Sequence, residues 1–342
     1  MILAIVLVGV LIFLHEAGHF TVAKAMNVRV KAFSIGFGPA LFKVRRGETI
    51  YQVCLVPFGG YVMFDDADPD GTAQLDPRAF EAQSTGRRAL IAVAGVLANV
   101  VVALCVLLAL YGFYGLPRMQ VTVTGTVPSS PAAVAGLRKG DQILSVAGLP
   151  MSTDAAQVTG IIARHDLKPI TVVIRRQGRT FPIRLIPRPI DGSPKIGVYL
   201  AERQIYVTRG ASMTARLGQA FSSTWQVLTV LVAGFVKLVT GQVPTSQMGG
   251  PVRIVSMTSE IAATGLASLL YWLALLSANL AVLNVVPFPG LDGGRLAFLL
   301  GEFLARGRRN IRVEQTINFI GLVVLMLFIG VLTVQDIVSL HP

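Results

Sequence analysis

The chain has 342 residues, of which 53% are hydrophobic and only 14% charged, and its mean hydropathy is +0.65. This composition excludes an ordinary soluble protein and predicts a polytopic α-helical membrane protein in a lipid bilayer, with a modest soluble portion. The net charge of +12 does not indicate a nucleic-acid partner, because membrane proteins concentrate Lys and Arg in cytoplasmic loops. Cys54 and Cys105 are the only cysteines, which excludes a disulfide framework and argues against a cysteine zinc site.

The first predicted segment, residues 1–25, is an apolar run that spans the membrane over about residues 2–23. It has no basic n-region and no small-residue cleavage site, so we expect a retained span rather than a signal peptide. Lys24, Arg29 and Lys31 follow it, and the positive-inside rule then makes its exit cytoplasmic and its N-terminus external.

His15-Glu16-Ala17-Gly18-His19 lies within this apolar run. Histidines at i and i+4 share one helix face and can bind one Zn²⁺, and Glu16 can accept a proton from a water molecule at the metal. An ionisable side chain at the centre of a membrane helix costs roughly 2.5–3.5 kcal/mol, so three polar groups here need a common reason. The sequence predicts a metal site with His15 and His19 as ligands and Glu16 as catalytic base, against the alternative of a chance motif in a soluble helix.

Residues 26–86 are predicted to form a cytoplasmic-side β-hairpin or re-entrant region over 28–64, followed by an acidic loop over 65–76. A strand edge beside the site could pair with an extended substrate, and an ordinary cytoplasmic hairpin is the alternative. Residues 87–115 are the second predicted span, running outward. This span contains Gly95-Val-Leu-Ala-Asn99, a packing surface for the first helix. Asn99 is either an interhelical hydrogen-bonder or a substrate contact.

Residues 116–204 change to a soluble pattern of short β-runs at 119–124, 142–146, 170–175 and 181–186, with one helix near 153–164. The run from Ser130 to Gly148, SPAAVAGLRKGDQILSVAG, resembles the PDZ domain of bacterial periplasmic proteases. That resemblance implies an α+β domain that can bind a peptide or C-terminus at a sheet edge. His165 is interpreted as a surface histidine.

The last third of the chain is predicted to contain two more spans, which makes four in all. Residues 205–262 form a linker with an interfacial helix over 225–241. Counting that helix as a full span would place the Arg306–Arg312 cluster outside. Residues 263–295 hold the third span, about 266–286, interrupted by Pro287-Phe-Pro289. Residues 296–342 hold a basic loop and the fourth span, about 317–334.

A catalytic zinc needs a third protein ligand and an open position. His165 and His341 are external in this topology, so the third ligand should be a carboxylate. Asp292 is the best candidate because it lies at the inner end of the third span, at the depth of His15 and His19. Glu302 and Glu314 are alternatives nearer the arginine-rich loop, and Asp292 could instead cap the following helix.

These motifs together resemble the site-2 protease family of intramembrane zinc metalloproteases, and within it the bacterial regulator-of-sigma-E proteases. The resemblance covers nearly the whole chain and rests on HEAGH, Gly95-x-x-x-Asn99, the PDZ-like run and Asn284…Leu291-Asp-Gly293. It implies zinc held by His15, His19 and Asp292, with Glu16 as base. It also implies substrate contacts at Asn284 and at Gly36-Phe37-Gly38, and both termini and the PDZ domain on the periplasmic or extracellular side of the plasma membrane. Only one PDZ domain fits here, where better-known relatives have two.

The expected activity is hydrolysis of a peptide bond within or near the transmembrane segment of a single-span protein. By resemblance, substrates are anti-sigma factors and remnant signal peptides, with the PDZ domain as size filter or docking site. Two other functions were weighed. A metal transporter or zinc-binding protein would spread its ionisable groups along a path. A PDZ scaffold with a degenerate site would have no use for Glu16.

Overall fold

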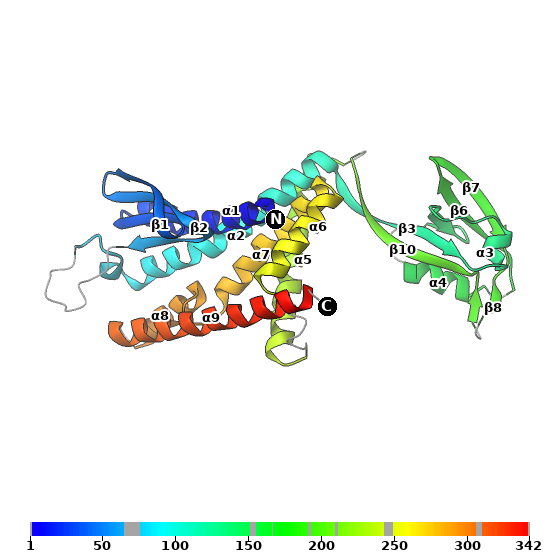
Figure 1. Ribbon diagram of the computed structural model, residues 1–342. Coiled ribbons are helices and arrows are strands. Elements are labelled where there is room, and N and C mark those ends of the chain that lie inside the picture. The colour runs from blue at the N-terminus through cyan, green and yellow to red at the C-terminus, as the bar shows by residue number, and fades with distance from the viewer. Residues whose placement is uncertain are drawn as a thin grey trace. The chain divides into compact units, whose positions relative to one another are not determined.

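The structure, a computed structural model, describes residues 2–64, 76–150, 155–165, 167–190, 193–208, 211–242, 249–305 and 310–340. The chain divides into two compact units, Met1–Leu110 with Leu217–Pro342 (unit 1) and Tyr111–Arg216 (unit 2). Unit 1 is mainly helical and contains one β-ribbon, whereas unit 2 is built around a sheet (Figure 1). Most of the expected acidic loop, residues 65–75, and part of the basic cluster, residues 306–309, lie outside the described residues.

Long apolar helices account for most of the chain outside unit 2. The helices of eight or more residues there are α1 (Ile2–Ala25), α2 (Thr85–Tyr114), α5 (Met213–Val239), α6 (Pro251–Thr264), α7 (Leu266–Val285), α8 (Asp292–Leu304) and α9 (Ile311–Leu340). Among the described residues, α1, α2, α5, α7 and α9 are long and apolar enough to cross a membrane by length and composition. The sequence predicts an interfacial helix over 225–241, whereas α5 begins at Met213. The count of four spans therefore stays a prediction.

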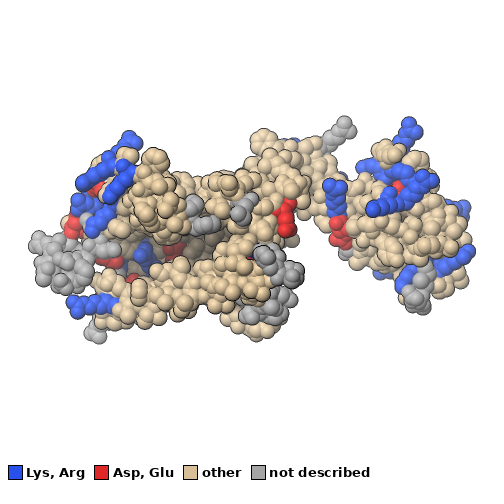
Figure 2. All heavy atoms as spheres, in the orientation of Figure 1, with Lys and Arg blue, Asp and Glu red and all other residues tan. Residues whose placement is uncertain are grey.

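The outward faces of these helices are apolar. On α9, for example, Phe319, Leu327 and Val331 are each about two thirds exposed, at 67%, 66% and 64%. Such a surface would be unfavourable in water, and it suits contact with lipid chains. Figure 2 shows the same pattern: the visible helical surface is almost free of charge, while Lys and Arg side chains gather over the β1–β2 ribbon and over unit 2.

The two long strands β1 (Val30–Arg46) and β2 (Thr49–Phe64) form the ribbon that the sequence predicts between the first two spans. Ser34 pairs with both Gln52 and Tyr61, so the ribbon folds back on itself. Gly36 and Gly38 adopt positive φ angles of 82° and 88°, which L-residues with a Cβ rarely adopt, and they provide the bend in β1.

A small apolar cluster anchors the base of the ribbon. It joins the end of α1, the start of β1, the end of β2, the short 3₁₀ helix η1 (Phe80–Ala82) and α2. Its buried members are Ala23, Val28, Val30, Phe64, Phe80 and Ile91. Phe64 stacks on Phe80 with ring centroids 4.7 Å apart. The ribbon, α1 and the start of α2 are therefore held at one point.

Unit 2 has a six-stranded antiparallel sheet. Its strands are β3 (Leu116–Thr126), β4 (Gln142–Val146), β5 (Leu149–Pro150), β6 (Ile170–Arg176), β7 (Arg179–Leu185) and β10 (Val198–Val207), with the order β10-β3-β4-β6-β7 and β5 paired to β4. The helices α3 (Pro131–Val134) and α4 (Ala155–Ala163) complete it, with a small ribbon of β8 (Arg188–Ile190) and β9 (Ser193–Lys195). The four β-runs and the helix expected from the sequence are all present within about four residues of their expected ends, except that residues 151–154 are not described.

The core of unit 2 is aliphatic. Alternate residues of β6, namely Ile170, Val172 and Ile174, are at most 2% exposed and belong to one buried cluster with Val158 and Ile162 of α4. This period of two, with one face buried and the other solvated, is the pattern that let the sequence identify the strands.

Candidate metal centre

Helices α1 and α2 approach each other closely because glycine occupies the contact on each side. A Cβ on Gly18 would lie 2.6 Å from both Ala94 O and Ala98 Cβ. A Cβ on Gly95 would lie 2.2 Å from His19 Nε2 and 2.7 Å from His15 Cε1. Any side chain at Gly95 would therefore occupy the space of the two imidazoles.

Asp292 reaches the same place through a tight turn between α7 and α8. Helix α7 ends at Val285, and α8 begins at Asp292 after the proline-containing turn that the sequence predicts. A Cβ on Gly293 would lie 2.2 Å from Val285 O, and one on Gly294 would lie 2.2 Å from Phe288 O. The two glycines are thus needed for the turn, and the turn presents Asp292 in the first turn of α8. Leu291 is the N-cap residue of α8, and no side-chain hydrogen bond caps the helix there.

Three donor atoms converge between α1 and α8. Asp292 Oδ2 lies 3.1 Å from His15 Nε2 and 3.1 Å from His19 Nε2, and the two Nε2 atoms are 3.2 Å apart. The histidines are 7% and 8% exposed. Among the described residues this is the group of His, Cys, Asp and Glu side chains that could hold a metal ion.

Each imidazole is oriented by a contact to its other nitrogen. His19 Nδ1 lies 2.7 Å from the carbonyl oxygen of Ile91 on α2, which can only accept, so Nδ1 carries the proton and Nε2 presents a lone pair. His15 Nδ1 contacts the side-chain amide of Asn99 at 3.0 Å. Asn99 is fully buried, and Ser277 on α7 donates to its backbone carbonyl at 2.8 Å. Such second contacts are the rule for metal-binding histidines.

The donor set fits zinc. Two imidazole nitrogens and one carboxylate oxygen are the ligands of many catalytic zinc sites, and ligands about 2.0–2.1 Å from a tetrahedral ion lie about 3.3 Å from one another. The observed separations are 3.1–3.2 Å. Asp292 Oδ2 is also buried without a hydrogen-bond partner, which a cation at this point would supply.

Glu16 lies beside the cluster and beneath the ribbon. It is close enough to His15, His19 and Asp292 to interact electrostatically with all three. A Cβ on Gly60 of β2 would lie 3.2 Å from Glu16 Cγ, so the strand passes directly over this side chain. Gly60 pairs with Ile35, next to the Gly36-Phe37-Gly38 bend.

The other predicted site residues make contacts of their own. Glu302 accepts from Arg88 and Thr85, and neither Glu302 nor Glu314 belongs to the cluster. Asn284 donates to Leu280 O of its own helix at 3.0 Å. Phe37 is half-exposed and stacks on Tyr61. His165 contacts Ile161 O, in unit 2.

Three contributors were not found from the sequence. The Ile91 carbonyl on α2 orients the His19 imidazole, Ser277 on α7 donates to the backbone carbonyl of Asn99, and Gly60 makes room for Glu16. Ser277, a polar residue in an otherwise apolar run, carries a signal that could have been used. A backbone carbonyl such as Ile91 O carries none.

The chain also matches known proteins. The model of Peptidase family M50 matches residues 3–328. The chain belongs to peptidase family M50, the site-2 protease family. A protein from Nostoc sp. whose name describes it as a zinc metalloprotease is 35% identical, over 94% of this chain and 92% of that protein. The zinc metalloprotease RasP of Oceanobacillus iheyensis is 28% identical over 97% of each.

A solved PDZ domain of an SdrC-like protein from Listeria monocytogenes also matches, over 23% of this chain and 85% of that one, with 22% identity and a TM-score of 0.22. The fold of unit 2 is defined by its own strands and core.

Family membership confirms the resemblance found in the sequence. The protein is a metalloprotease with zinc as its expected cofactor. With several apolar helices, it is a multi-pass membrane protein. The transporter and scaffold alternatives are set aside.

Proposed function

We propose that this protein is an intramembrane zinc endopeptidase in which His15, His19 and Asp292 hold the metal and Glu16 is the catalytic base. The observation that carries the proposal is the convergence of three lone-pair atoms, 3.1–3.2 Å apart, between helices of an apolar unit. Two neutral imidazole nitrogens and a carboxylate oxygen repel one another at this separation unless a cation lies between them. Zinc bound there supplies Lewis acidity towards a carbonyl oxygen and towards water.

The chain's own groups have separate tasks in this proposal. Glu16 takes the proton from the attacking water and later delivers it to the leaving amide nitrogen. Asn99 and the Ile91 carbonyl keep the Nε2 lone pairs aimed at the metal, through their contacts with Nδ1 of His15 and His19. For His15 this requires that Asn99 Oδ1 face Nδ1–H. Oδ1 is the buried Asn99 atom that lacks a partner in the present amide orientation, and a half-turn of the amide supplies one.

The proposed substrates are single-span membrane proteins, including anti-sigma-factor-like proteins and remnant signal peptides. A helical substrate hides its carbonyls in hydrogen bonds, so it must unwind before cleavage. The ribbon over Glu16 offers strand edges beside the site for an extended segment, near Gly36-Phe37-Gly38, and Asn284 at the end of α7 is the further proposed contact.

Unit 2 is proposed to act as a PDZ domain that docks or filters substrates outside the membrane. In support, β10 is an edge strand of its sheet. A cavity of about 390 Å³ lies between this strand and α4, lined by Ile162 and by Gly197 to Tyr199 among others. A peptide could extend the sheet there. Unit 2 and both termini are proposed to be periplasmic or extracellular on the plasma membrane of a bacterium, with four spans and α5 at the interface.

The test is cleavage of a tagged single-span substrate by the purified protein. Glu16→Gln should lower kcat by about 10²–10⁴ and leave zinc content unchanged, because the base is not a ligand. Asp292→Asn should lose both zinc and activity, because a ligand is removed. Full cleavage by Glu16→Gln, or full zinc content in Asp292→Asn, would contradict the respective role.

A further inference from the structure

The far end of α8 is tied to the start of α2 by a buried ion pair. Arg88 Nη2 donates to Glu302 Oε1 at 2.5 Å, and the two side chains are only 4% and 11% exposed. Arg88 also donates through Nε to Gln83 O at 3.1 Å, and Thr85 Oγ1 donates to Glu302 at 3.4 Å. The contact links residues that are 214 positions apart in the chain.

A second carboxylate lies beside the same guanidinium: Glu81 Oε2 is 3.6 Å from Arg88 Nη1. Removing charges from water is costly, and buried ion pairs often add little net stability compared with apolar residues of the same shape. In some proteins such pairs instead fix the register between the elements they join. We therefore look for an effect of the Arg88–Glu302 ion pair on the position of α8 rather than on the free energy of unfolding.

The same face of α8 makes a second contact with this region. Arg295, Leu299 and Glu302 lie at i, i+4 and i+7, on one side of the helix. The Arg295 guanidinium lies 5.2 Å from the centre of the Phe80 ring, and Leu299 is 4% exposed. The contact of Arg295 with Phe80 of η1 and the ion pair of Glu302 with Arg88 of α2 thus hold α8 both in its rotation about its own axis and in its position along that axis.

Helix α2 contacts both histidines of the metal centre. Ile91, Gly95 and Asn99 touch the two histidines of α1, and Arg88 lies on the same helix, about one turn before Ile91. Asp292 is ten residues before Glu302 on α8, about 15 Å at 1.5 Å per residue. A rigid helix held at Glu302 therefore carries its first turn to a fixed place relative to the histidines.

We propose that the Arg88–Glu302 ion pair is a positioning latch, which sets the register of α8 on α2 and so holds Asp292 against His15 and His19. Arg88 and Glu302 are positioning residues, since neither touches the donor atoms. The proposal rests on the proposed role of Asp292 as a zinc ligand. It assigns a purpose to Glu302, which the sequence offered only as an alternative ligand.

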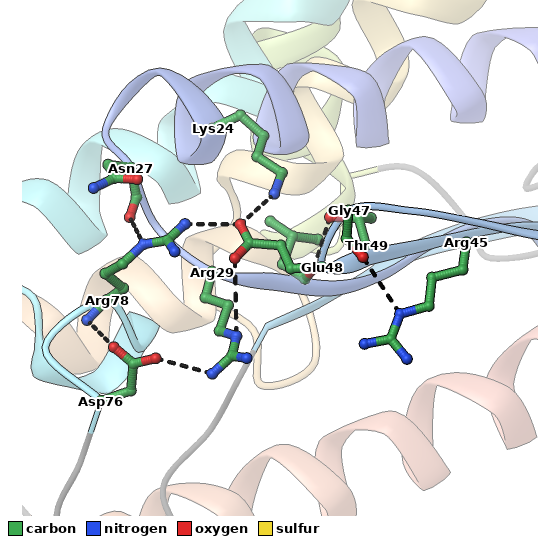
Figure 3. Close-up of polar contacts among 10 residues, drawn as sticks. Lys24, Asn27, Arg29, Arg45, Gly47, Glu48, Thr49, Asp76 and Arg78 are labelled. Atoms are coloured by element: carbon green, nitrogen blue, oxygen red, sulfur yellow. Dashed lines mark hydrogen bonds and ion pairs between the residues drawn. The ribbon is translucent and has the colours of Figure 1, made fainter.

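A different ion network in the same unit provides the matched control. Glu48, in the turn between β1 and β2, accepts from Lys24 at 2.8 Å and from Arg78 at 2.7 Å, and its other oxygen lies 4.0 Å from Arg29 (Figure 3). Arg29 also donates to Asp76 at 2.9 Å. This network ties the ribbon to the end of α1, and none of the contacts drawn involves α8. Replacing Glu48 removes a comparable set of charged contacts without touching the latch.

The experiment compares zinc release from the purified full-length protein when a chelator is added, for wild type, Glu302→Gln and Glu48→Gln, with the thermal midpoint of each. Loss of a supporting contact at a metal site typically costs 10–100-fold in affinity. We expect Glu302→Gln to release zinc about 10–100-fold faster and Glu48→Gln to release it at the wild-type rate. Excess zinc should restore the kcat of Glu302→Gln, with KM unchanged.

A rescue variant separates positioning from general damage. Glu302→Asp should return zinc release towards the wild-type rate, because it keeps a carboxylate for Arg88 at the same helix position, whereas an exchange of the two charges would place a carboxylate at position 88 beside Glu81. The proposal is overturned if Glu302→Gln releases zinc at the wild-type rate, or if Glu48→Gln releases it just as fast as Glu302→Gln. Asp292→Asn distinguishes failure of the zinc-ligand assignment from failure of the proposed role of the Arg88–Glu302 ion pair. If it keeps zinc, the ligand assignment fails, whereas if it loses zinc and Glu302→Gln does not, only the latch fails.

Discussion

The metal centre of unit 1 and the sheet of unit 2 are held together in different ways. In unit 2, aliphatic side chains such as Val172 and Ile174 fill an ordinary core. At the metal centre the helices meet through glycines, and the groups between them are polar: His15, His19 and Asn99 are at most 8% exposed. Polar groups buried in an apolar unit are costly, so each of them needs a partner. Damage at the centre should therefore appear as lost zinc, and damage in unit 2 as lost local stability.

Gly95→Ala should produce the largest effect. The added Cβ would lie 2.2 Å from His19 Nε2, a distance that real Cβ atoms do not show, so a ligand must move. We expect zinc affinity to fall by at least about 100-fold, the upper end for supporting residues, with a parallel loss of cleavage. Gly112→Ala, on the same helix with nothing within 4 Å of its Cβ, is the control and should keep wild-type affinity. Equal zinc affinity in the two variants would show that the close packing of α1 on α2 is unimportant.

Asn99→Ala should have the next largest effect. It removes the contact to His15 Nδ1, and we expect about 10–100-fold weaker zinc binding, measured by competition with a chelator. Asn99→Asp offers only acceptor oxygens, so it should retain more zinc than Asn99→Ala if His15 Nδ1 is the donor. The opposite ranking of the two variants would mean that His15 Nδ1 is not the donor.

Asp141→Asn tests the unit 2 side of the comparison. Arg176 donates to both carboxylate oxygens at 2.6 Å and the Arg138 N–H donates at 2.8 Å. Burial alone would raise the pKa of Asp141, but these donors hold it below its usual value of 3.8. The charged form is thus favoured in the folded state, so its stabilisation is complete above about pH 4 and is lost as pH falls further.

We expect Asp141→Asn to destabilise unit 2 by about 1–3 kcal/mol at neutral pH and by less as the wild-type carboxyl protonates. Hydrogen exchange of β4 and β6 in the full-length protein measures this, while zinc content should not change. Zinc loss in Asp141→Asn, or a penalty that grows at low pH, would contradict the separation of the two units.

Much of the fold was predictable from the sequence, for different reasons in each unit. The alternation of β6 and the turn glycines of unit 2 are local signals, and so are the apolar runs of the helices. That His15 and His19 lie side by side was predictable because one helical turn separates them. That Asp292 joins them was predictable from the order and direction of the predicted spans, which put it at the same depth.

Contacts between distant segments were not predictable. Nothing local indicates that Ile91 O orients His19, that Ser277 supports Asn99, or that Glu302 pairs with Arg88 across 214 residues. The assignment of α5 rested on charge placement along the chain, which depends on the orientation of every span before it.

The most direct test of the central claim is X-ray absorption at the zinc edge of the purified wild-type protein. We expect nitrogen and oxygen ligands at about 2.0–2.1 Å, scattering from two imidazoles, and no sulfur at about 2.3 Å. Asp292→Asn should lose this zinc signal. A sulfur ligand, a number of imidazoles other than two, or an unchanged spectrum in Asp292→Asn would contradict zinc binding by His15, His19 and Asp292.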